Sequence, residues 1–145
     1  MARGLKLTMR ISSMADYAIV AMRSIALRPA GERMNAAGIA AEAGLPAPTV
    51  QKLVSMLAQA GLLLSARGAG GGFCLARPAT AITLADIIEA IEGPIAMTGC
   101  ATEHGDCNRQ ENCGVRPHWP QANQAVRGAL EQITLAQLAQ EEVAA

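Results

Sequence analysis

The chain has 145 residues, 51% of them hydrophobic and 17% charged, which favours one small domain with a buried core and excludes a disordered tail. Aromatic residues make up only 2%, which excludes an aromatic stacking surface for single-stranded nucleic acid. The longest uncharged run, residues 53–66, is shorter than the about 18 apolar residues of a membrane span. Arg10 and Asp16 interrupt the apolar N-terminal stretch, so no signal peptide is predicted and the cytoplasm is the expected compartment.

The net charge of zero hides two oppositely charged halves. Residues 1–77 carry nine basic and three acidic groups, a net charge of +6, and residues 78–145 carry three basic and nine acidic groups, a net charge of −6. Such asymmetry predicts a basic half that meets an anion and an acidic half with a different task.

Three helices are predicted in the basic half. The first runs from Ile11 with apolar residues at i, i+3, i+4 and i+7, begins with a Ser13–Asp16 start signal and ends at residues 29–31. Asn35 caps a short second helix, and Gly44 follows it in a tight turn. The third helix opens at residues 46–48 and ends at Gly61. Its predicted buried face consists of Val50, Leu53, Val54, Leu57 and Ala60.

A β-hairpin is predicted after the third helix. Residues 62–65 and 73–76 are strand-like, and a glycine-rich turn separates them. A phosphate-binding loop is excluded because Phe73 follows the glycines, where such a loop has Lys and Ser or Thr. The order helix, glycine turn, helix and hairpin is that of a winged helix-turn-helix.

In a winged helix-turn-helix, the second helix of the pair enters the major groove of DNA. Gln51 can bond adenine, Lys52 can reach guanine or phosphate, and Arg67 of the hairpin can enter the minor groove. The alternative is a three-helix core with an ordinary hairpin and no DNA role. The candidate DNA contacts are Arg10, Ser12, Pro48, Thr49, Gln51, Lys52, Ser55, Arg67, Gly68 and Gly70.

The acidic half contains two more predicted helices and a polar loop. Thr83 and Asp86 mark the start of a helix over residues 82–93. A polar loop over residues 96–116 follows it. A long helix begins near Pro117 with an apolar stripe, and Thr134 caps a last short helix.

Cys100, Cys107 and Cys113 lie together in the polar loop. Clustered cysteines of an intracellular protein more often bind metal than form disulfides. The paired spacing of structural zinc sites is absent, and the longer spacings suit an iron–sulfur cluster held by thiolates. Three free thiols are the alternative. Cys74, on a predicted strand, is expected to be a small buried hydrophobic residue.

Three thiolates leave one cluster ligand to be supplied. His104 lies inside the loop, His118 follows the last cysteine by five residues, and Asp16 reaches the site only if the first helix packs nearby. Each has a structural alternative: a solvated loop residue for His104, a packed helix-start residue for His118, and the capping-box carboxylate of its own helix for Asp16.

Several segments resemble one family. Residues 9–18, 66–78 and 82–94 are similar to the opening, the wing and the segment before the cysteine loop of the IscR/NsrR-type bacterial regulators, which form a superfamily of winged-helix iron–sulfur transcription factors. Residues 112–119 and 125–131 most resemble the regulators of SUF-system iron–sulfur cluster assembly. The resemblance covers residues 9–142.

The resemblance implies a homodimer built on the long C-terminal helix, a cluster on the three loop cysteines and control of transcription. Arg116 stands where some relatives place a histidine ligand. Other relatives recruit an acidic residue of the first helix from the partner subunit, and Asp16 matches that position, so Asp16 is preferred over His118 and His104. A 2Fe–2S cluster is favoured over 4Fe–4S. The implied regions are residues 1–80 for DNA binding, 81–95 as a connecting helix, 96–116 for the cluster, and 117–145 for dimerisation and the tail.

The sequence therefore predicts a mainly α protein, a winged helix-turn-helix with a long dimerisation helix and a cysteine-bearing loop. The predicted function is a dimeric regulator that binds near-palindromic double-stranded DNA and senses iron–sulfur cluster status, with no membrane and no small-molecule substrate. No nucleophile–base pairing is present, so an enzyme is not expected. The alternatives are a nitric-oxide- or iron-responsive repressor of this fold, a zinc-stabilised winged-helix protein and a small redox protein.

Overall fold

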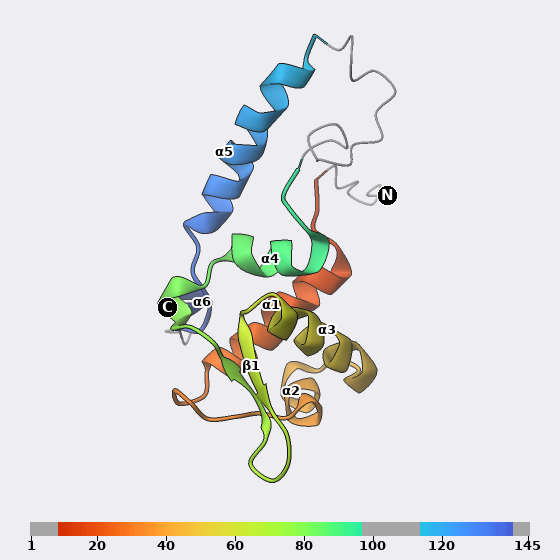
Figure 1. Cartoon of the computed structure of the whole chain (residues 1–145), viewed down its shortest axis with the longest axis vertical. Coiled ribbons are helices and arrows are strands. Elements are labelled where there is room, and N and C mark those ends of the chain that lie inside the picture. The colour runs from red at the N-terminus through yellow and green to blue at the C-terminus, as the bar shows by residue number, and fades with distance from the viewer. Residues whose placement is uncertain (1–8, 97–113, 141–145) are drawn as a thin grey trace, which may run out of the picture.

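The structure is a computed structural model that describes residues 9–96 and 114–140. Figure 1 shows a body made of the first four helices, a β-hairpin and the last short helix, from which the long fifth helix projects. The elements are α1 (Ser13–Ala26), α2 (Ala36–Ala43), α3 (Ala47–Gln59), β1 (Leu63–Ala66), β2 (Gly72–Leu75), α4 (Leu84–Glu92), α5 (Trp119–Glu131) and α6 (Leu135–Leu138), with 3₁₀ turns at Ala79–Ala81 and Arg116–His118.

One hydrophobic core joins the two halves of the chain. Helices α1, α2 and α3 pack against one another, and α4 packs across α1. Ile82 before α4 and Leu135 in α6 are fully buried in the same core as Met22, Leu53 and Leu57. Each such side chain contributes about 1.5–3 kcal/mol through burial. The C-terminal end of α5 is thereby fixed to the body by α6.

Local capping signals start three of the helices as predicted. Asn35 accepts a hydrogen bond from the backbone N–H of Gly38 at 2.7 Å and starts α2. Thr83 starts α4 through a capping box with Asp86, and Thr134 starts α6 through one with Gln137. Each cap satisfies backbone N–H groups that the first helical turn leaves without a partner.

The start of α1 differs from the prediction. Ser12, not Ser13, is the N-cap, and its hydroxyl accepts a hydrogen bond from the N–H of Ala15 at 3.1 Å. Asp16 then lies one position beyond the place where a capping-box carboxylate must stand. The backbone N–H of Ser12 donates instead to Oε1 of Glu92, at the end of α4, at 2.8 Å. The capping-box role predicted as the alternative for Asp16 is therefore wrong.

The predicted buried face of α3 is confirmed with one correction. Val50, Leu53, Val54 and Leu57 are buried, whereas Ala60 is exposed. Ala60 is the C-cap of the helix, and Gly61 follows it with a left-handed backbone, φ +80°. The chain therefore turns away from the core face at Ala60 before it enters the hairpin.

The hairpin is antiparallel, and Leu63 pairs with Leu75 and Ala66 with Gly72. Its strands are shifted by one residue from the predicted limits, to Leu63–Ala66 and Gly72–Leu75. The long helix α5 begins at Trp119, after the 3₁₀ turn, and buries none of its residues within the chain. None of the described helices combines the length and the hydropathy needed to cross a membrane.

Candidate DNA-binding interface and metal site

Helices α2 and α3 form a helix-turn-helix. Gly44 ends α2 in a left-handed conformation, φ +70°, which lets the chain reverse within three residues and begin α3 after Pro46. The inner face of α3 is anchored in the core by Val50, Leu53 and Leu57. The opposite side of α3 leaves Pro48, Gln51, Lys52 and Ser55 exposed, so these side chains are available to DNA, whereas Thr49 is half-buried.

The wing is the hairpin of β1, β2 and the loop between them, and it extends beyond the helix-turn-helix at one end of the body (Figure 1). Arg67, Gly68 and Gly70 all lie in this loop and are exposed. Gly68 and Gly70 have φ values of +85° and +76°, a region that other residues adopt only with strain. The loop is therefore a tight glycine turn with an arginine at its base.

The wing is hydrogen-bonded to the segment before α2. The N–H of Met34 donates to the carbonyl of Phe73 at 3.0 Å, and the N–H of Phe73 donates to the carbonyl of Met34 at 2.7 Å. The next residue, Asn35, caps α2. At Gly72, an added Cβ would lie 2.6 Å from the carbonyl oxygen of Met34, so only glycine allows this close approach. The wing and the helix-turn-helix therefore form one connected unit.

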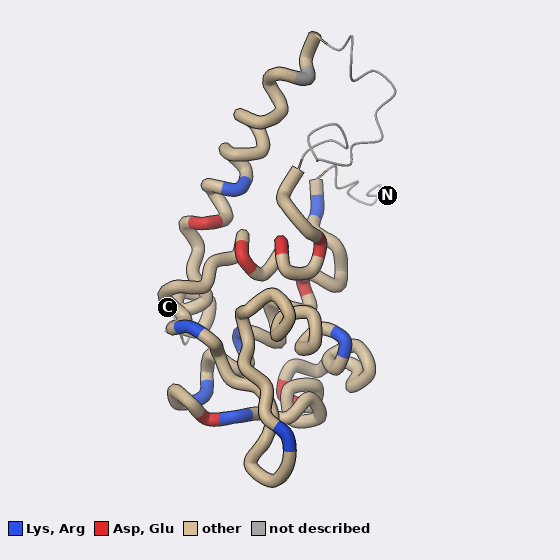
Figure 2. The backbone as a smooth tube through the Cα atoms, in the orientation of Figure 1, with Lys and Arg blue, Asp and Glu red and all other residues tan. Residues whose placement is uncertain are grey.

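Several arginines form ion pairs or hydrogen bonds, whereas the basic side chains of α3 and the wing form none with the described residues. Arg28 pairs with Glu42, Arg77 lies 3.7 Å from Asp86, and Arg23 donates to the carbonyl of Leu138 at 2.7 Å. Within the described part of the chain, the basic side chains with no hydrogen bond or ion pair are Arg10, Arg33, Lys52 and Arg67. Figure 2 shows basic residues on α3 and the wing, and acidic residues gathered on α4 and the adjoining end of α5.

Arg33 is an exposed basic residue that sequence reasoning missed. It directly precedes Met34, the residue that pairs with the wing. Sequence patterns gave no reason to select it because it lies in an irregular segment between two helices. Because Met34 forms a bridge with Phe73, the backbone of the neighbouring Arg33 lies near the wing strand β2.

The candidate metal ligands are only partly within the described structure. Cys100, His104, Cys107 and Cys113 lie outside the described residues. Asp16 is exposed in the first turn of α1, and its carboxylate makes no hydrogen bond or ion pair with any other described residue. His118 is also exposed, in the turn that leads into α5, so the alternative of a packed helix-start residue is wrong. Within residues 9–96 and 114–140, no three His, Cys, Asp or Glu side chains are grouped to hold a metal ion.

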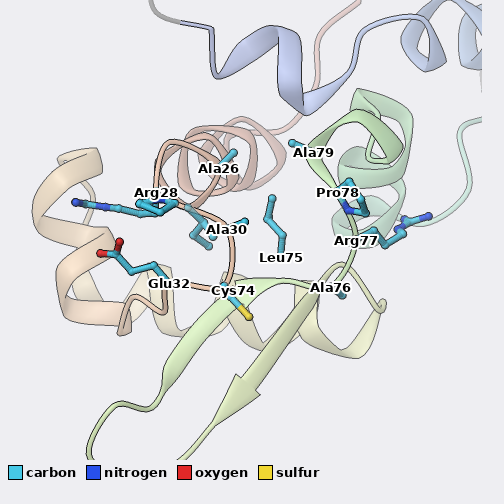
Figure 3. A pocket seen from close by; sticks show the side chains of 13 residues that line it. Ala26, Arg28, Ala30, Glu32, Cys74, Leu75, Ala76, Arg77, Pro78 and Ala79 are labelled. Carbon is cyan, nitrogen blue, oxygen red and sulfur yellow. The ribbon is translucent and has the colours of Figure 1, made fainter.

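Cys74 is separated in the sequence from the three loop cysteines. Its side chain, on β2, is 7% exposed, which confirms the prediction of a small buried residue. It borders a pocket of about 480 Å³ between the end of α1 and the wing. Figure 3 shows Leu75 pointing into this pocket, whereas Arg28 and Arg77 extend outward on opposite sides. Of the charged residues that line it, Arg28 pairs with Glu42 and Arg77 lies near Asp86, and we assign the cavity no ligand.

A helix-turn-helix with an attached wing and free cations on its exposed side defines a winged-helix DNA-binding protein. The chain belongs to the Rrf2 family, described as iron-dependent transcriptional regulators, whose sequence profile matches residues 11–141. The predicted family and the predicted winged-helix fold are thereby confirmed.

The relatives of the chain are transcription factors. The HTH-type transcriptional regulator IscR of Yersinia enterocolitica is 32% identical over 130 residues, which cover 90% of this chain and 79% of that protein. CymR, the global cysteine regulator of B. subtilis, is 32% identical with a TM-score of 0.70, covering 91% of this chain and 97% of CymR. IscR of T. potens is 28% identical with a TM-score of 0.69, and the match covers 95% of this chain and 93% of that protein. The prediction of a DNA-binding transcriptional regulator rather than an enzyme is confirmed.

Proposed function

We propose that the protein is a dimeric transcriptional regulator whose affinity for DNA depends on an iron–sulfur cluster. Cys100, Cys107 and Cys113 supply three thiolates, and Asp16 of the partner subunit supplies the fourth ligand. The genes it controls are those of iron–sulfur cluster assembly of the SUF type. The observation that carries this proposal is the state of Asp16: it is exposed at the start of α1 and has no capping role, because it stands one position beyond the capping-box site and the N–H of Ser12 donates to Glu92.

The chemistry of the donor set suits an iron–sulfur cluster better than the common structural metals. Thiolates hold such clusters, and the loop lacks the paired cysteines of a structural zinc site. A single oxygen donor among three thiolates changes the reduction potential and makes a cluster more easily lost, which suits a sensor. When bound, the cluster supplies a centre that responds to oxidants or to iron supply.

The surface of α5 supports a homodimer. No residue of this helix is fully buried within the described chain: Ala122, Val126 and Leu130, which recur at helical spacing along one side, are only half-buried, and Val126 and Leu130 line an open groove beside α4. A projecting helix whose apolar side is only half-covered by its own chain gains from a partner surface, and a second copy of the same helix can supply it by symmetry. A two-fold dimer places two recognition helices on half-sites spaced about one helical turn apart, hence a near-palindromic operator.

A second candidate function follows from the likeness to CymR. A regulator that responds to cysteine supply, as the name of CymR describes, would need no cluster. Under that alternative, the three loop cysteines are free thiols, and Asp16 is a solvated surface residue. Iron and acid-labile sulfide content separate the two functions directly.

The experiment that tests the proposed function is purification without oxygen, followed by iron and sulfide analysis and visible spectroscopy. A brown protein with both elements, whose affinity for the DNA upstream of its own gene changes on cluster loss in a gel-shift assay, supports the proposal. Colourless protein with bound zinc supports a structural zinc site instead. Protein without iron or sulfide after reconstitution contradicts the cluster proposal, and DNA binding alone then identifies an ordinary winged-helix repressor.

Replacement of Gln51 by alanine is expected to weaken binding to the natural operator by roughly 1–3 kcal/mol and to relax the preference at one base position. The side chain is exposed on the outer face of α3, where a bidentate contact to adenine is available. Gel shifts on a set of single-base operator variants measure both effects. Equal weakening on all sequences would show that Gln51 contacts only the DNA backbone.

The matched comparison for Gln51 is its neighbour Lys52, which is exposed and unpaired in the described structure. Replacing Lys52 by alanine is expected to reduce the slope of log affinity against log salt by about 1, because one phosphate contact is lost. Base preference should stay unchanged in this variant.

Replacement of Asp16 by alanine is expected to leave a cluster bound by three thiolates but to alter its visible spectrum and to speed its loss in air by about tenfold. The reason is that the proposed oxygen donor is replaced by solvent. Glu32→Ala is the control, because Glu32 is exposed and its carboxylate has no partner in the described part of the chain. If His118→Ala or His104→Ala changes the spectrum while Asp16→Ala does not, the fourth ligand is that histidine.

A further inference from the structure

The C-terminal turn of α4 carries two glutamates that are used differently from every other acidic residue in the described structure. Glu89 and Glu92 are three residues apart, so they lie on the same side of the helix. Each accepts a hydrogen bond from the backbone N–H of a distant or following segment rather than from its own helix. We name the two side chains and their partners the α4 junction.

Glu92 connects α4 to the start of α1. Its Oε1 accepts the N–H of Ser12 at 2.8 Å across 80 positions of sequence. Ser12 is the N-cap of α1, and Arg10 precedes it by two residues. The contact therefore holds the point at which the chain enters α1, and with it two of the proposed DNA contacts and the first turn that carries Asp16.

Glu89 connects α4 to two further segments at once. Its Oε1 accepts from Nε of Arg127 in α5 at 2.7 Å, and its Oε2 accepts from the N–H of Ile95 at 3.1 Å. Arg127 also pairs with Glu131 one turn later in α5. Ile95 stands five residues before Cys100 in the sequence. One half-buried carboxylate thus joins the helix proposed to dimerise to the chain that leads toward the cysteines.

The space around the junction allows its parts to move against one another. A groove of about 550 Å³ lies among the segment before α1, the end of α4 and α5. Its lining includes Arg10, Ile11, Glu92, Ile95, Val126 and Leu130. Tightly packed interiors resist displacement, whereas an open groove between segments lets one shift with few lost contacts. Helix α4 itself packs against α1 and α5, but residues 9–12 before α1 are exposed at this groove, so the hydrogen bond from Ser12 to Glu92 holds a segment that little packing fixes.

We propose that Glu89 and Glu92 are positioning residues that set the place of the α1 N-terminus, and hence of Arg10 and Ser12, according to the path of the chain after Ile95. The inference deepens the proposed function, because the cluster on the loop cysteines would be what fixes that path. A different path of the chain after Ile95 would alter the hydrogen bond between Ile95 and Glu89. The last turn of α4 would then shift, and Glu92 would carry Ser12 with it through their hydrogen bond.

The first test uses the protein without cluster and without DNA. Solvent exchange of the Ser12 amide, measured by NMR, is expected to speed up about tenfold in Glu92→Ala, and Glu92→Gln, which keeps an acceptor oxygen, should restore part of the protection. Glu89→Ala is expected to speed exchange at both Ile95 and Ser12, although Glu89 does not touch Ser12. If Glu89→Ala speeds exchange at Ile95 alone, the proposed link is wrong, because the two glutamates would then act separately. Glu32→Ala should change neither amide.

The second test compares the DNA affinity of the cluster-loaded protein and the cluster-free protein on the duplex that the wild type binds. Glu92→Ala is expected to bring the ratio of the two affinities at least about threefold closer to one, while the visible absorption of the cluster stays the same. If the ratio of the two DNA affinities is unchanged in a variant with an intact cluster, the proposed link through Glu92 is wrong, whereas the proposed function is not contradicted. If the wild type carries no cluster, the proposed function is contradicted, and the amide-exchange experiment alone tests the link between Glu89, Glu92 and Ser12.

Discussion

Replacement of Cys107 by alanine is expected to abolish the visible absorption of the anaerobically purified protein and to reduce its iron content to near zero. In the proposed site three thiolates and the Asp16 carboxylate hold the cluster, so loss of Cys107 leaves two thiolates and the carboxylate, and two thiolates are too few to hold it. The affinity of the variant for the operator should then equal that of the cluster-free wild type. Visible spectroscopy, iron and sulfide analysis and gel shifts measure these outcomes.

The control for Cys107 is the fourth cysteine of the chain. Cys74 is buried on β2 of the wing, and no charged group among the described residues pairs with its thiol. Cys74→Ala should therefore retain the full iron content and the cluster-dependent change in DNA binding. If Cys107→Ala keeps the colour and the regulation of the wild type, the cluster-sensing function is rejected, and a regulator with free thiols takes its place.

Sequence patterns predicted the helix starts whose caps are local. The Thr83–Asp86 pair and Asn35 satisfy N–H groups within three residues of themselves, so the signal and its effect lie in the same short segment. The start of α1 was misplaced by one residue because its second capping partner is Glu92, 80 positions away. A contact of that kind leaves no pattern in the surrounding sequence.

The wing was also predicted with small errors that have a physical source. The glycine run marks the turn, but its last residue, Gly72, belongs to β2, where it pairs with Ala66 and lies against Met34 of a distant segment. The long-range pairing of Met34 with Phe73 places Arg33 beside the wing, and the sequence alone offered no sign of it.

For the candidate site, sequence reasoning was strongest where residue chemistry itself is informative. Three clustered cysteines and an exposed polar face on α3 suggest a metal group and a DNA surface without any coordinates. The contacts that connect the two regions could not be predicted, because Glu89 and Glu92 look like ordinary solvated charges on α4. Their role depends on which backbone N–H groups the fold brings to them.

Replacement of Gly72 by alanine is expected to lower the free energy of unfolding by roughly 2–4 kcal/mol and to weaken DNA binding more than about tenfold. Gly72 has φ +124°, and an added Cβ would lie 2.6 Å from the carbonyl oxygen of Met34. The obstructing atoms belong to backbone, so relief requires β2 to move away from the segment that leads into α2. The wing would then lose its fixed position relative to α3. Chemical denaturation and gel shifts measure the two effects.

Gly70 provides the matched control for this substitution. It also has a positive φ, +76°, but an added Cβ there meets nothing within 4 Å. Gly70→Ala should therefore cost only about 1 kcal/mol of backbone strain, with the contact between Met34 and Phe73 intact. Both variants must be compared at the same protomer concentration, because dimerisation contributes to the measured stability. Because Gly70 is itself a candidate DNA contact, the comparison rests on stability: an equal loss in the two variants would show that backbone strain alone, and not the link between wing and helix-turn-helix, makes Gly72 necessary.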